Sequence, residues 1–368
     1  MSERNNRRTI KNSRRKQARK NTFFLLAAGV IVLLMAGVLY FNEKNGRSLF
    51  GAAGESTPSS ILSAETLLSV ETPSLEPVPT PTPTPTEAPT PTPEPTPTPD
   101  PFSLYFSENE EVTIIEGELW EYRGPDLYVH IEKMYYEDCS SIFFVADIYT
   151  RNYGNLISGL WEESKGRQCV YPEKLARKYR AVYAQNGDFF ADSWNTALGP
   201  SIRNGIEYKK VLGPDAMAFM PDCSLKMLRN GRDDYSTAAM LAEGIEHTYA
   251  FGPILVENGE ICTDLPRHSL FRKNPRSAIG MVEPGHFVSI LVDGRKPRIS
   301  YGCTLQRLAE EFVARGCVSA YNLDGGQSTA MVFMGNQIND HKNETTPGQR
   351  RLPDMIIIGT SEMSLGGE

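Results

Sequence analysis

The 368-residue sequence lacks the pattern of a zinc site, because its five histidines are scattered and none of its six cysteines forms a Cys-x-x-Cys pair. Structural zinc sites depend on closely spaced Cys and His ligands, so we expect no cofactor and leave open only a divalent cation. The even number of cysteines permits three disulfides, but a large domain does not need them, and buried free thiols are an equal alternative. The cysteines are Cys139, Cys169, Cys223, Cys262, Cys303 and Cys317.

The C-terminal part of the chain also lacks a surplus of basic charge. The whole chain has a net charge of −7, residues 1–20 contribute +8 and residues 21–101 contribute −6, which leaves −9 for residues 102–368. Nucleic-acid binding needs clustered cations that neutralise phosphates, so we exclude nucleic acid as a partner. Any phosphate chemistry in residues 102–368 must then depend on a few individually placed arginines.

A long uncharged apolar run, residues 22–41, follows the basic start of the chain. As a helix it spans about 30 Å, the thickness of the hydrocarbon core of a bilayer. A cleavable signal peptide needs a shorter apolar core and a small-x-small cleavage site, which the sequence after Met35 does not offer. We therefore predict an uncleaved transmembrane signal-anchor, with residues 1–21 as a cytoplasmic basic tail and the C-terminal part outside the cell membrane, because basic residues stay inside.

Residues 42–101 are dominated by Ser, Thr, Glu and Pro, with alternating Thr-Pro over residues 80–85 and, broken by Glu94, over residues 90–99. Such a segment cannot bury enough apolar surface to offset the entropy of ordering, and its prolines favour extended polyproline II conformations. We therefore predict a disordered linker that holds the rest of the chain away from the membrane. O-glycosylation or binding to proline-recognising modules is an alternative use of the same repeats.

Residues 102–368 lack a second Pro/Ser-rich break, so we predict that they form one extracytoplasmic folded unit. Apolar runs typical of strands recur along it, and neighbouring runs can pair as hairpins, for example across the Glu-Pro-Gly-His turn at residues 283–286. Because strands outnumber helices, we predict an α+β fold with mixed or antiparallel sheets and a few packed helices. The expected strands are residues 127–135, 142–149, 181–184, 248–256, 277–282, 287–292, 318–323, 329–334 and 355–358.

Two helices are expected, over residues 172–180 and 305–315. The second has the clearer signals, since apolar residues recur on one face, Thr304 is a candidate N-cap, and Gly316 follows the last turn.

Three polar turns next to apolar runs contain candidate site residues. The first turn contains Asn186 and Asp188, the second contains Arg276, and the third contains Asp293 and Arg295. Asn-Gly and Asp-Gly are common hairpin turns, so the first and third patterns can be purely structural. The guanidinium fork of arginine, however, suits bidentate binding of a phosphate or a carboxylate.

The fourth and strongest cluster is Ala-Tyr-Asn-Leu-Asp-Gly-Gly-Gln-Ser-Thr at residues 320–329. Asn322 and Asp324 end an apolar run, and the glycine pair lets the chain turn and expose N–H groups that can form an anion-binding nest. Residues 326–330 also approximate the nucleophile elbow of serine hydrolases. That interpretation is weak, because an elbow leads into a helix, whereas a strand-like run follows here. In addition, the only histidine that could complete a catalytic triad is the distant His341.

The order of these motifs resembles that of the phosphodiester glycosidase domain family. The resemblance runs from about Val182 to Ile358, and seven short segments in one order make it specific. The segments are AQNGDFF (184–190), FGPILVENG (251–259), NPRSAIG (274–280), VDGR (292–295), GCTLQRLAEEF (302–312), AYNLDGGQST (320–329) and RLPD (351–354). Members of the family commonly have glycine where this chain has Asp188, and a small residue where it has Gln327.

The resemblance implies a hydrolase that cleaves sugar 1-phosphodiesters at the anomeric C–O bond. Together with the predicted membrane anchor, this predicts a membrane-anchored surface enzyme that acts on glycans or envelope polymers. A phosphate monoester is a good leaving group, so such a site must mainly stabilise an oxocarbenium-like centre and the departing charge. The resemblance thus implies a phosphodiester-linked glycan as partner, and the apolar run at residues 22–41 separately predicts contact with the membrane.

The resemblance also suggests roles for single residues. We predict that Arg276 and Arg295 clamp the phosphate, and that Asp293 or Asp324 acts as the base or stabilises the oxocarbenium-like centre. The residues expected to bind the substrate are Asn186, Asp188, Asn322, Gly325, Gly326 and Ser328.

Two other functions remain open at this point. The first is a metal-dependent phosphoesterase with Asp188, Asp293 and Asp324 as oxygen ligands. The second is a non-catalytic glycan-binding ectodomain on a stalk. The sequence does not identify the sugar, its aglycone or the oligomeric state.

Overall fold

The computed structural model describes residues 102–367, except 164–165, 168, 189–198, 211–212, 233–234, 267–271 and 341–348. The predicted basic tail (1–21), transmembrane segment (22–41) and linker (42–101) lie outside these residues, as does His341. No helix in the described part of the chain is both long enough and apolar enough to cross a bilayer.

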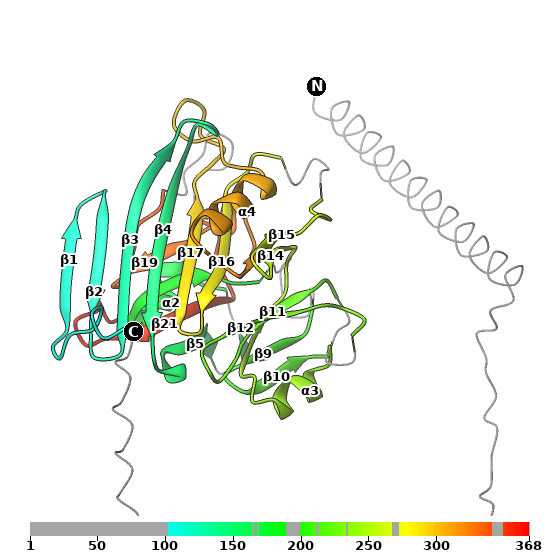
Figure 1. Ribbon diagram of the computed structural model, residues 1–368. Coiled ribbons are helices and arrows are strands. Elements are labelled where there is room, and N and C mark those ends of the chain that lie inside the picture. The colour runs from blue at the N-terminus through cyan, green and yellow to red at the C-terminus, as the bar shows by residue number, and fades with distance from the viewer. Residues whose placement is uncertain are drawn as a thin grey trace, which may run out of the picture. The chain divides into compact units, whose positions relative to one another are not determined.

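Within the described residues, the strands form two large sheets and three small ones, and all pairings between named strands are antiparallel. The larger sheet has nine strands (Figure 1). In spatial order they are β1 (Glu111–Ile115), β2 (Leu119–Arg123), β3 (Leu127–Tyr136), β4 (Ser141–Thr150), β17 (His286–Val292), β16 (Arg276–Glu283), β18 (Ser319–Asn322), β14 (Ile254–Glu257) and β15 (Glu260–Ile261).

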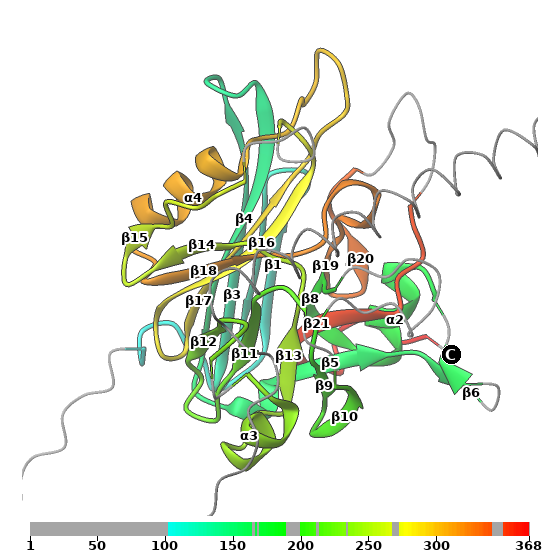
Figure 2. The ribbon, with the colours of Figure 1, turned by 90° about the vertical axis from the view of Figure 1, so that its right-hand side faces the viewer.

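The second large sheet has five strands in the described region, and the small sheets extend the fold beside it (Figure 2). Its order is β20 (Asn336–Gln337), β19 (Met331–Phe333), β8 (Ala181–Asn186), β21 (Asp354–Thr360) and β5 (Leu156–Leu160). The small sheets comprise β12 (Leu225–Leu228), β11 (Ala216–Phe219) and β13 (His247–Tyr249), then β10 (Ile206–Lys209) and β9 (Ser201–Arg203), then β6 (Glu162–Glu163) and β7 (Gly166–Arg167). The helical elements are α2 (Pro172–Lys178), α3 (Thr237–Ala242), α4 (Leu305–Ala314), and the 3₁₀ turns η1 (Tyr153–Asn155) and η4 (Gly326–Ser328).

The two large sheets pack against each other, with α4 on the outer face of the first and α2 on the outer face of the second (Figure 2). Side chains of a strand alternate between its two faces, so each strand contributes to two layers of core. In β4, Phe144 and Ala146 pack between the sheets, whereas Phe143 and Val145 pack on the α4 side. The core around the two large sheets therefore lies in three apolar layers, and the middle layer fixes one sheet against the other. A fourth apolar cluster lies at the small sheets and α3.

The predicted fold class is confirmed in its antiparallel sheets and few helices. The Glu-Pro-Gly-His turn joins β16 to β17, with Glu283 opposite His286 and a φ of +84° at Gly285, the conformation that glycine adopts most readily. Helix α4 begins as predicted, because the Thr304 hydroxyl accepts a hydrogen bond from the Arg307 N–H at 3.1 Å.

The single strand predicted over residues 248–256 is wrong. The structure has two strands there, β13 and β14, which belong to different sheets. Gly252, with a φ of +80°, and Pro253, joined to it by a cis peptide bond, separate them. Neither residue suits the middle of a strand, since proline has no N–H for the ladder and the backbone at Gly252 is left-handed.

All six cysteines, which lie in the described part of the chain, are free thiols. Cys139, Cys223, Cys303 and Cys317 are buried. Burial raises the pKa of Cys303 and of Cys317 to about 12, so these thiols stay protonated at neutral pH. Of the two states that the sequence permits, the structure has thiols and not disulfides, and four of the six are buried.

Candidate active site

The turn of residues 323–328 is the centre of the candidate site, and backbone hydrogen bonds hold it between the two large sheets. On one side, the Leu323 N–H donates to the Ser277 carbonyl at 2.8 Å, next to the start of β16. On the other side, the Asp324 N–H donates to the carbonyl of Gly187, just after β8, at 3.3 Å. Three of the four polar turns predicted from the sequence therefore meet here.

The glycine pair allows close packing of this turn. A Cβ on Gly325 would lie 2.7 Å from the Pro275 carbonyl oxygen, and Gly326 has a φ of +66°. Both N–H groups donate within the protein, and their expected contact with an anion stays a prediction. Gly325 donates to Asp324 Oδ1 at 2.9 Å, and Gly326 donates to the Pro275 carbonyl at 3.1 Å.

Arg295 brings its guanidinium group to this glycine pair, since a Cβ on Gly326 would lie 3.0 Å from Arg295 Nη2. Arg295 is exposed, and its Nη2 donates to Asn274 Oδ1 at 3.1 Å. Arg276 is buried, and its guanidinium donates to the carbonyls of Cys303 at 3.2 Å and Arg272 at 2.7 Å. These carbonyls fix Arg276 but do not neutralise its charge.

Neither arginine forms an ion pair with a described acidic residue. Burial lowers the pKa of Arg276, and the nearby positive charge of Arg295 lowers it further. Two neighbouring cations without a carboxylate partner make this surface attractive to an anion.

Asp324 is the buried acid of the site. Its carboxylate accepts hydrogen bonds from the Gly325 N–H and from the hydroxyl of Ser328, which is itself buried. Burial raises the pKa of Asp324 to about 6, although Ser328 and the charge of Arg350 favour the carboxylate. A carboxyl group with this pKa exchanges a proton near neutral pH, as a general acid or base must.

Asp293 has a different setting from Asp324. Its buried carboxylate forms an ion pair with Lys296, with Nζ 2.9 Å from Oδ2, and the Ser300 hydroxyl donates to its backbone carbonyl at 2.6 Å. Burial raises the pKa of Asp293, while Lys296 lowers it. These contacts close the loop that presents Arg295, whose φ is +58°. Asp293 therefore supports Arg295, and Asp324 is the better candidate for the base.

The two predicted asparagines also hold the backbone. Asn186 donates to the Asp324 carbonyl at 2.7 Å and accepts from the Ala330 N–H at 3.1 Å. Asn322 donates to the Gly252 carbonyl at 2.7 Å, and its buried Oδ1 has no hydrogen-bond partner among the described residues. Both amides thus tie neighbouring segments to the turn, and their predicted role in binding the substrate stays a prediction.

Asp188 lies behind the site, in a buried ion triad with Arg203 and Asp354. Arg203 Nη2 is 2.6 Å from Asp188 Oδ2 and 2.6 Å from Asp354 Oδ2. The Asp188 side chain is only 1% exposed and forms an ion pair with Arg203, so its predicted role in binding the substrate stays a prediction. Among the described residues, no group of three His, Cys, Asp or Glu side chains is arranged to hold a metal ion.

Sequence reasoning missed Arg203 and Lys296, the cations that engage two of the predicted acids. Lys296 directly follows the Asp-Gly-Arg turn, and the i,i+3 spacing from Asp293 was its only local signal. Arg203 lies in a short strand and has no such signal, because its partners are 15 and 151 residues away.

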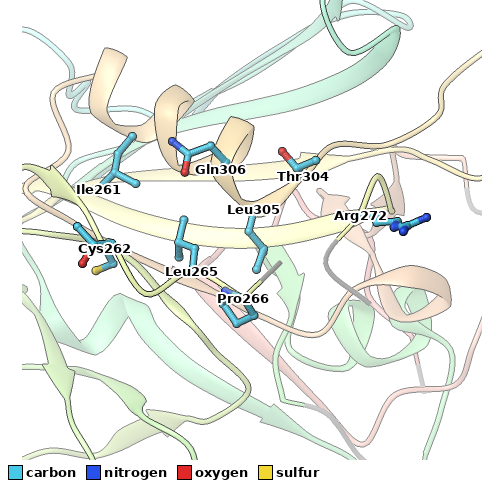
Figure 3. A pocket seen from close by; sticks show the side chains of 9 residues that line it. Ile261, Cys262, Leu265, Pro266, Arg272, Thr304, Leu305 and Gln306 are labelled. Atoms are coloured by element: carbon cyan, nitrogen blue, oxygen red, sulfur yellow. The ribbon is translucent and has the colours of Figure 1, made fainter. Parts of the chain in front are cut away.

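A pocket of about 590 Å³ lies near this site, at the N-terminus of α4 (Figure 3). Ile261, Leu265 and Leu305 give it apolar walls, and Arg272, whose carbonyl anchors Arg276, lines one end. None of the predicted site residues lines this pocket. The polar site and the pocket are thus neighbours with different chemical character.

Comparison with known proteins identifies similar families and folds. The family model described as "Phosphodiester glycosidase" matches residues 179–359. The "SPbeta prophage-derived uncharacterized protein YomE" of Bacillus subtilis (strain 168) is 32% identical over 199 residues, which cover 50% of this chain and 29% of that protein. The chain thus spans less than a third of the length of this curated relative.

Solved structures show a related fold. The catalytic domain of zebrafish N-acetylglucosamine-1-phosphodiester alpha-N-acetylglucosaminidase, auto-inhibited by its pro-peptide, matches with a TM-score of 0.51 and 16% identity, over 68% of this chain and 88% of that chain. A hypothetical protein from Synechocystis matches with a TM-score of 0.49 and 14% identity, over 63% of this chain and 62% of that chain. At 16% identity, the zebrafish structure supports a shared fold.

The raised pKa of Asp324 predicts that the Asp324→Asn substitution stabilises the protein at neutral and alkaline pH. A buried acid whose pKa is raised from 3.8 to about 6 destabilises the folded state increasingly as the pH rises between these values. We expect the free energy of unfolding of Asp324→Asn to exceed that of the wild type by about 1–3 kcal/mol at pH 8, and to match it near pH 3.5. Denaturant unfolding monitored by tryptophan fluorescence measures the free energy of unfolding of the two proteins at each pH.

Asp138→Asn is the matched control. Asp138 pairs with Arg307 at 2.6 Å, and this hydrogen bond lowers the pKa of Asp138. The ionised Asp138 therefore stabilises the folded state, opposite to Asp324, and Asp138→Asn should lower the free energy of unfolding at pH 8. A loss of stability at pH 8 in Asp324→Asn would contradict the burial argument.

Proposed function

Residues 179–359 of this chain belong to the phosphodiester glycosidase family, and on this premise we propose that the protein is a hydrolase that cleaves sugar 1-phosphodiesters at the anomeric C–O bond. The observation that carries the proposal is the placement of Arg276 and Arg295 beside Asp324. Within the described residues, two cations lack a carboxylate partner next to a buried acid whose pKa is about 6. This combination suits an anionic substrate that needs a proton transfer.

The two arginines would bind the phosphodiester. A buried guanidinium group without a counterion costs free energy, and a bound anion recovers that cost. The phosphodiester carries one negative charge, and the phosphate monoester that leaves develops a second one. The attraction to Arg276 and Arg295 therefore grows along the reaction, which is the condition for catalysis.

Asp324 would act on the sugar side of the bond. As the bond from C1 to the phosphate oxygen breaks, positive charge develops at C1, and a nearby carboxylate stabilises it. Water then bonds to C1 through its oxygen and gives one proton to the carboxylate. The products are a free sugar and a phosphate monoester that keeps both electrons of the broken bond. Because this role needs the ionised acid, the rate should rise with pH through about 6.

The location of the enzyme follows from the N-terminal composition. We propose that residues 22–41 anchor the chain in the cell membrane and that residues 42–101 act as a spacer, so that the domain reaches glycans or envelope polymers outside. The uncharged apolar run beside nine basic residues and the Thr-Pro repeats support this arrangement.

Turnover in ¹⁸O-labelled water tests the reaction. The purified full-length chain should release free sugar from a sugar 1-phosphodiester, with ¹⁸O in the sugar and none in the phosphate monoester. Asp324→Asn should lower kcat about 100-fold or more while the protein stays folded. Label in the phosphate would indicate P–O cleavage by a phosphoesterase, and tight glycan binding without turnover would indicate a binding ectodomain. Either result would overturn the proposal.

Arg295→Gln tests the anion site, with Arg298→Gln as its control. Both arginines are exposed in one loop and have a positive φ, of +58° and +67°, so the two substitutions carry the same backbone strain. In Arg295→Gln, the loss of a charged hydrogen bond to phosphate should lower kcat/KM about 10- to 100-fold. Inhibition by inorganic phosphate should weaken to a similar degree. Arg298→Gln should stay within about twofold of the wild type. Equal effects of the two substitutions would place the phosphate elsewhere.

Protease treatment of intact cells tests the location. Added protease should remove the C-terminal domain and leave an epitope tag at the N-terminus undigested, because the tag lies in the cytoplasm. A C-terminal domain that survives in intact cells but not in lysed cells would contradict the proposed orientation.

A further inference from the structure

The pocket at the N-terminus of α4 has one cationic end and one apolar end. Figure 3 shows Arg272 at one end and Ile261 and Cys262 at the other, with Leu265 and Leu305 between them. Its volume of about 590 Å³ lies within the range of about 300–1,000 Å³ that is typical of sites for small organic ligands. The pocket thus has room for much more than a phosphate group.

The cationic end of the pocket adjoins the proposed phosphate site through direct hydrogen bonds. Arg276 Nη2 donates to the carbonyl of Arg272 at 2.7 Å, and Asn274 Nδ2 donates to the same carbonyl at 3.3 Å. Asn274 Oδ1 in turn accepts from Arg295 Nη2 at 3.1 Å. Arg276 Nε donates to the carbonyl of Cys303, which directly precedes the α4 segment that lines the pocket. The pocket and the two site arginines therefore share a wall.

Arg272 adds a third positive charge to this end of the pocket. It is exposed, and it forms no ion pair with an acidic residue in the described part of the chain. No Asp or Glu is among the described residues that line the pocket. The charge at this end therefore favours a ligand with an anionic group.

Polar side chains on the α4 wall of the pocket already have partners on the same helix. The Thr304 hydroxyl accepts from the Arg307 N–H at 3.1 Å, and the Gln306 amide donates to Glu310 Oε1 at 3.0 Å. A sugar in the pocket would need hydrogen bonds for its hydroxyl groups, whereas an alkyl chain gains free energy from contact with apolar walls. The walls therefore favour an apolar occupant.

We propose that the pocket and the arginines form one elongated site for the phosphate ester of an apolar alcohol. The phosphate would lie at Arg272, Arg276 and Arg295, and the alcohol would extend between Leu265 and Leu305. This inference rests on the proposed function in naming the substrate, which is a sugar 1-phosphodiester with an apolar alcohol as its aglycone. Cleavage of the bond from C1 to the phosphate oxygen would leave the alkyl phosphate in this site.

Binding of alkyl phosphates to the full-length chain tests the site without any turnover. Methyl, butyl and octyl phosphate would be titrated by calorimetry, at concentrations at which octyl phosphate forms no micelles. Each methylene that enters the pocket should raise the affinity about three- to fourfold. Octyl phosphate should therefore bind about 100-fold or more tightly than methyl phosphate. Equal affinities of the three esters would overturn the proposal.

Gln306→Trp and Glu310→Trp form a matched pair of variants. Each substitution removes the same hydrogen bond between two exposed side chains and adds the same ring to α4, but of the two positions only Gln306 lines the pocket. Gln306→Trp should weaken the binding of octyl phosphate about tenfold or more and leave that of methyl phosphate unchanged. Glu310→Trp should stay within about twofold of the wild type for both esters. Equal losses in the two variants, or no loss in Gln306→Trp, would overturn the proposal.

The Cys262 thiol provides a second test in the wild type, which does not depend on the folding of a variant. Cys262 and Cys169 are both half-buried, and only Cys262 of the two lines the pocket. Burial raises the pKa of Cys262, so alkylation by iodoacetamide would be followed at pH 9 by mass spectrometry. At about ten times its Kd, octyl phosphate should slow the alkylation of Cys262 about tenfold and leave that of Cys169 unchanged. Unchanged alkylation of Cys262 would overturn the proposal.

Turnover separates this inference from the proposed function. A sugar 1-phosphodiester with an octyl aglycone should have a kcat/KM about 100-fold or more above that of the methyl diester, and Gln306→Trp should abolish the difference. Equal kcat/KM values, or faster cleavage of a diester with a second sugar as aglycone, would refute the pocket assignment alone. Tight binding of octyl phosphate without turnover of any diester would refute the proposed function and leave the alkyl phosphate site intact.

Discussion

Three backbone hydrogen bonds of the turn at residues 323–328 hold the site together, since they join the ends of interior strands from two separate sheets. The turn donates to Ser277 and Pro275 beside β16 and to Gly187 after β8. Backbone bonds of this kind need close approach, which is why the turn contains two glycines and why Gly325 has no room for a side chain. The packing of the two sheets thus sets the position of Asp324.

Charges in this region are divided between the interior and the surface. Behind and beside the turn, acids are engaged by cations, Asp293 by Lys296 and Asp354 by Arg203. In front of the turn, Arg295 has no acidic partner among the described residues. Asp293 and Asp354 therefore belong to the scaffold, whereas Arg295 leaves positive charge at the surface, where the proposed function places the phosphate. A mildly acidic domain can bind an anion in this way because local placement, and not net charge, decides the field at a site.

The sequence predicts those parts of the fold that local patterns determine. Long strands such as β3 and β16, the hairpin turn at residues 283–286 and the cap at Thr304 follow from periodicity and turn chemistry. Short strands such as β9 are too short to show an alternating apolar pattern, and they form because neighbouring strands offer hydrogen-bond partners. For the site, polar turns identify the right segments. The role of each acid depends on a cation that is distant in sequence or has only a weak local signal, so Asp188 and Asp293 could not be separated from Asp324 beforehand.

The free thiols have a consequence for the environments in which the domain can work. In the interior of the domain, buried cysteine thiols pack among apolar side chains, and no disulfide joins the described segments. Disulfide formation is then no step in folding, and the native state should be equally populated in reducing and oxidising media. A domain with this property tolerates a surface whose redox conditions fluctuate.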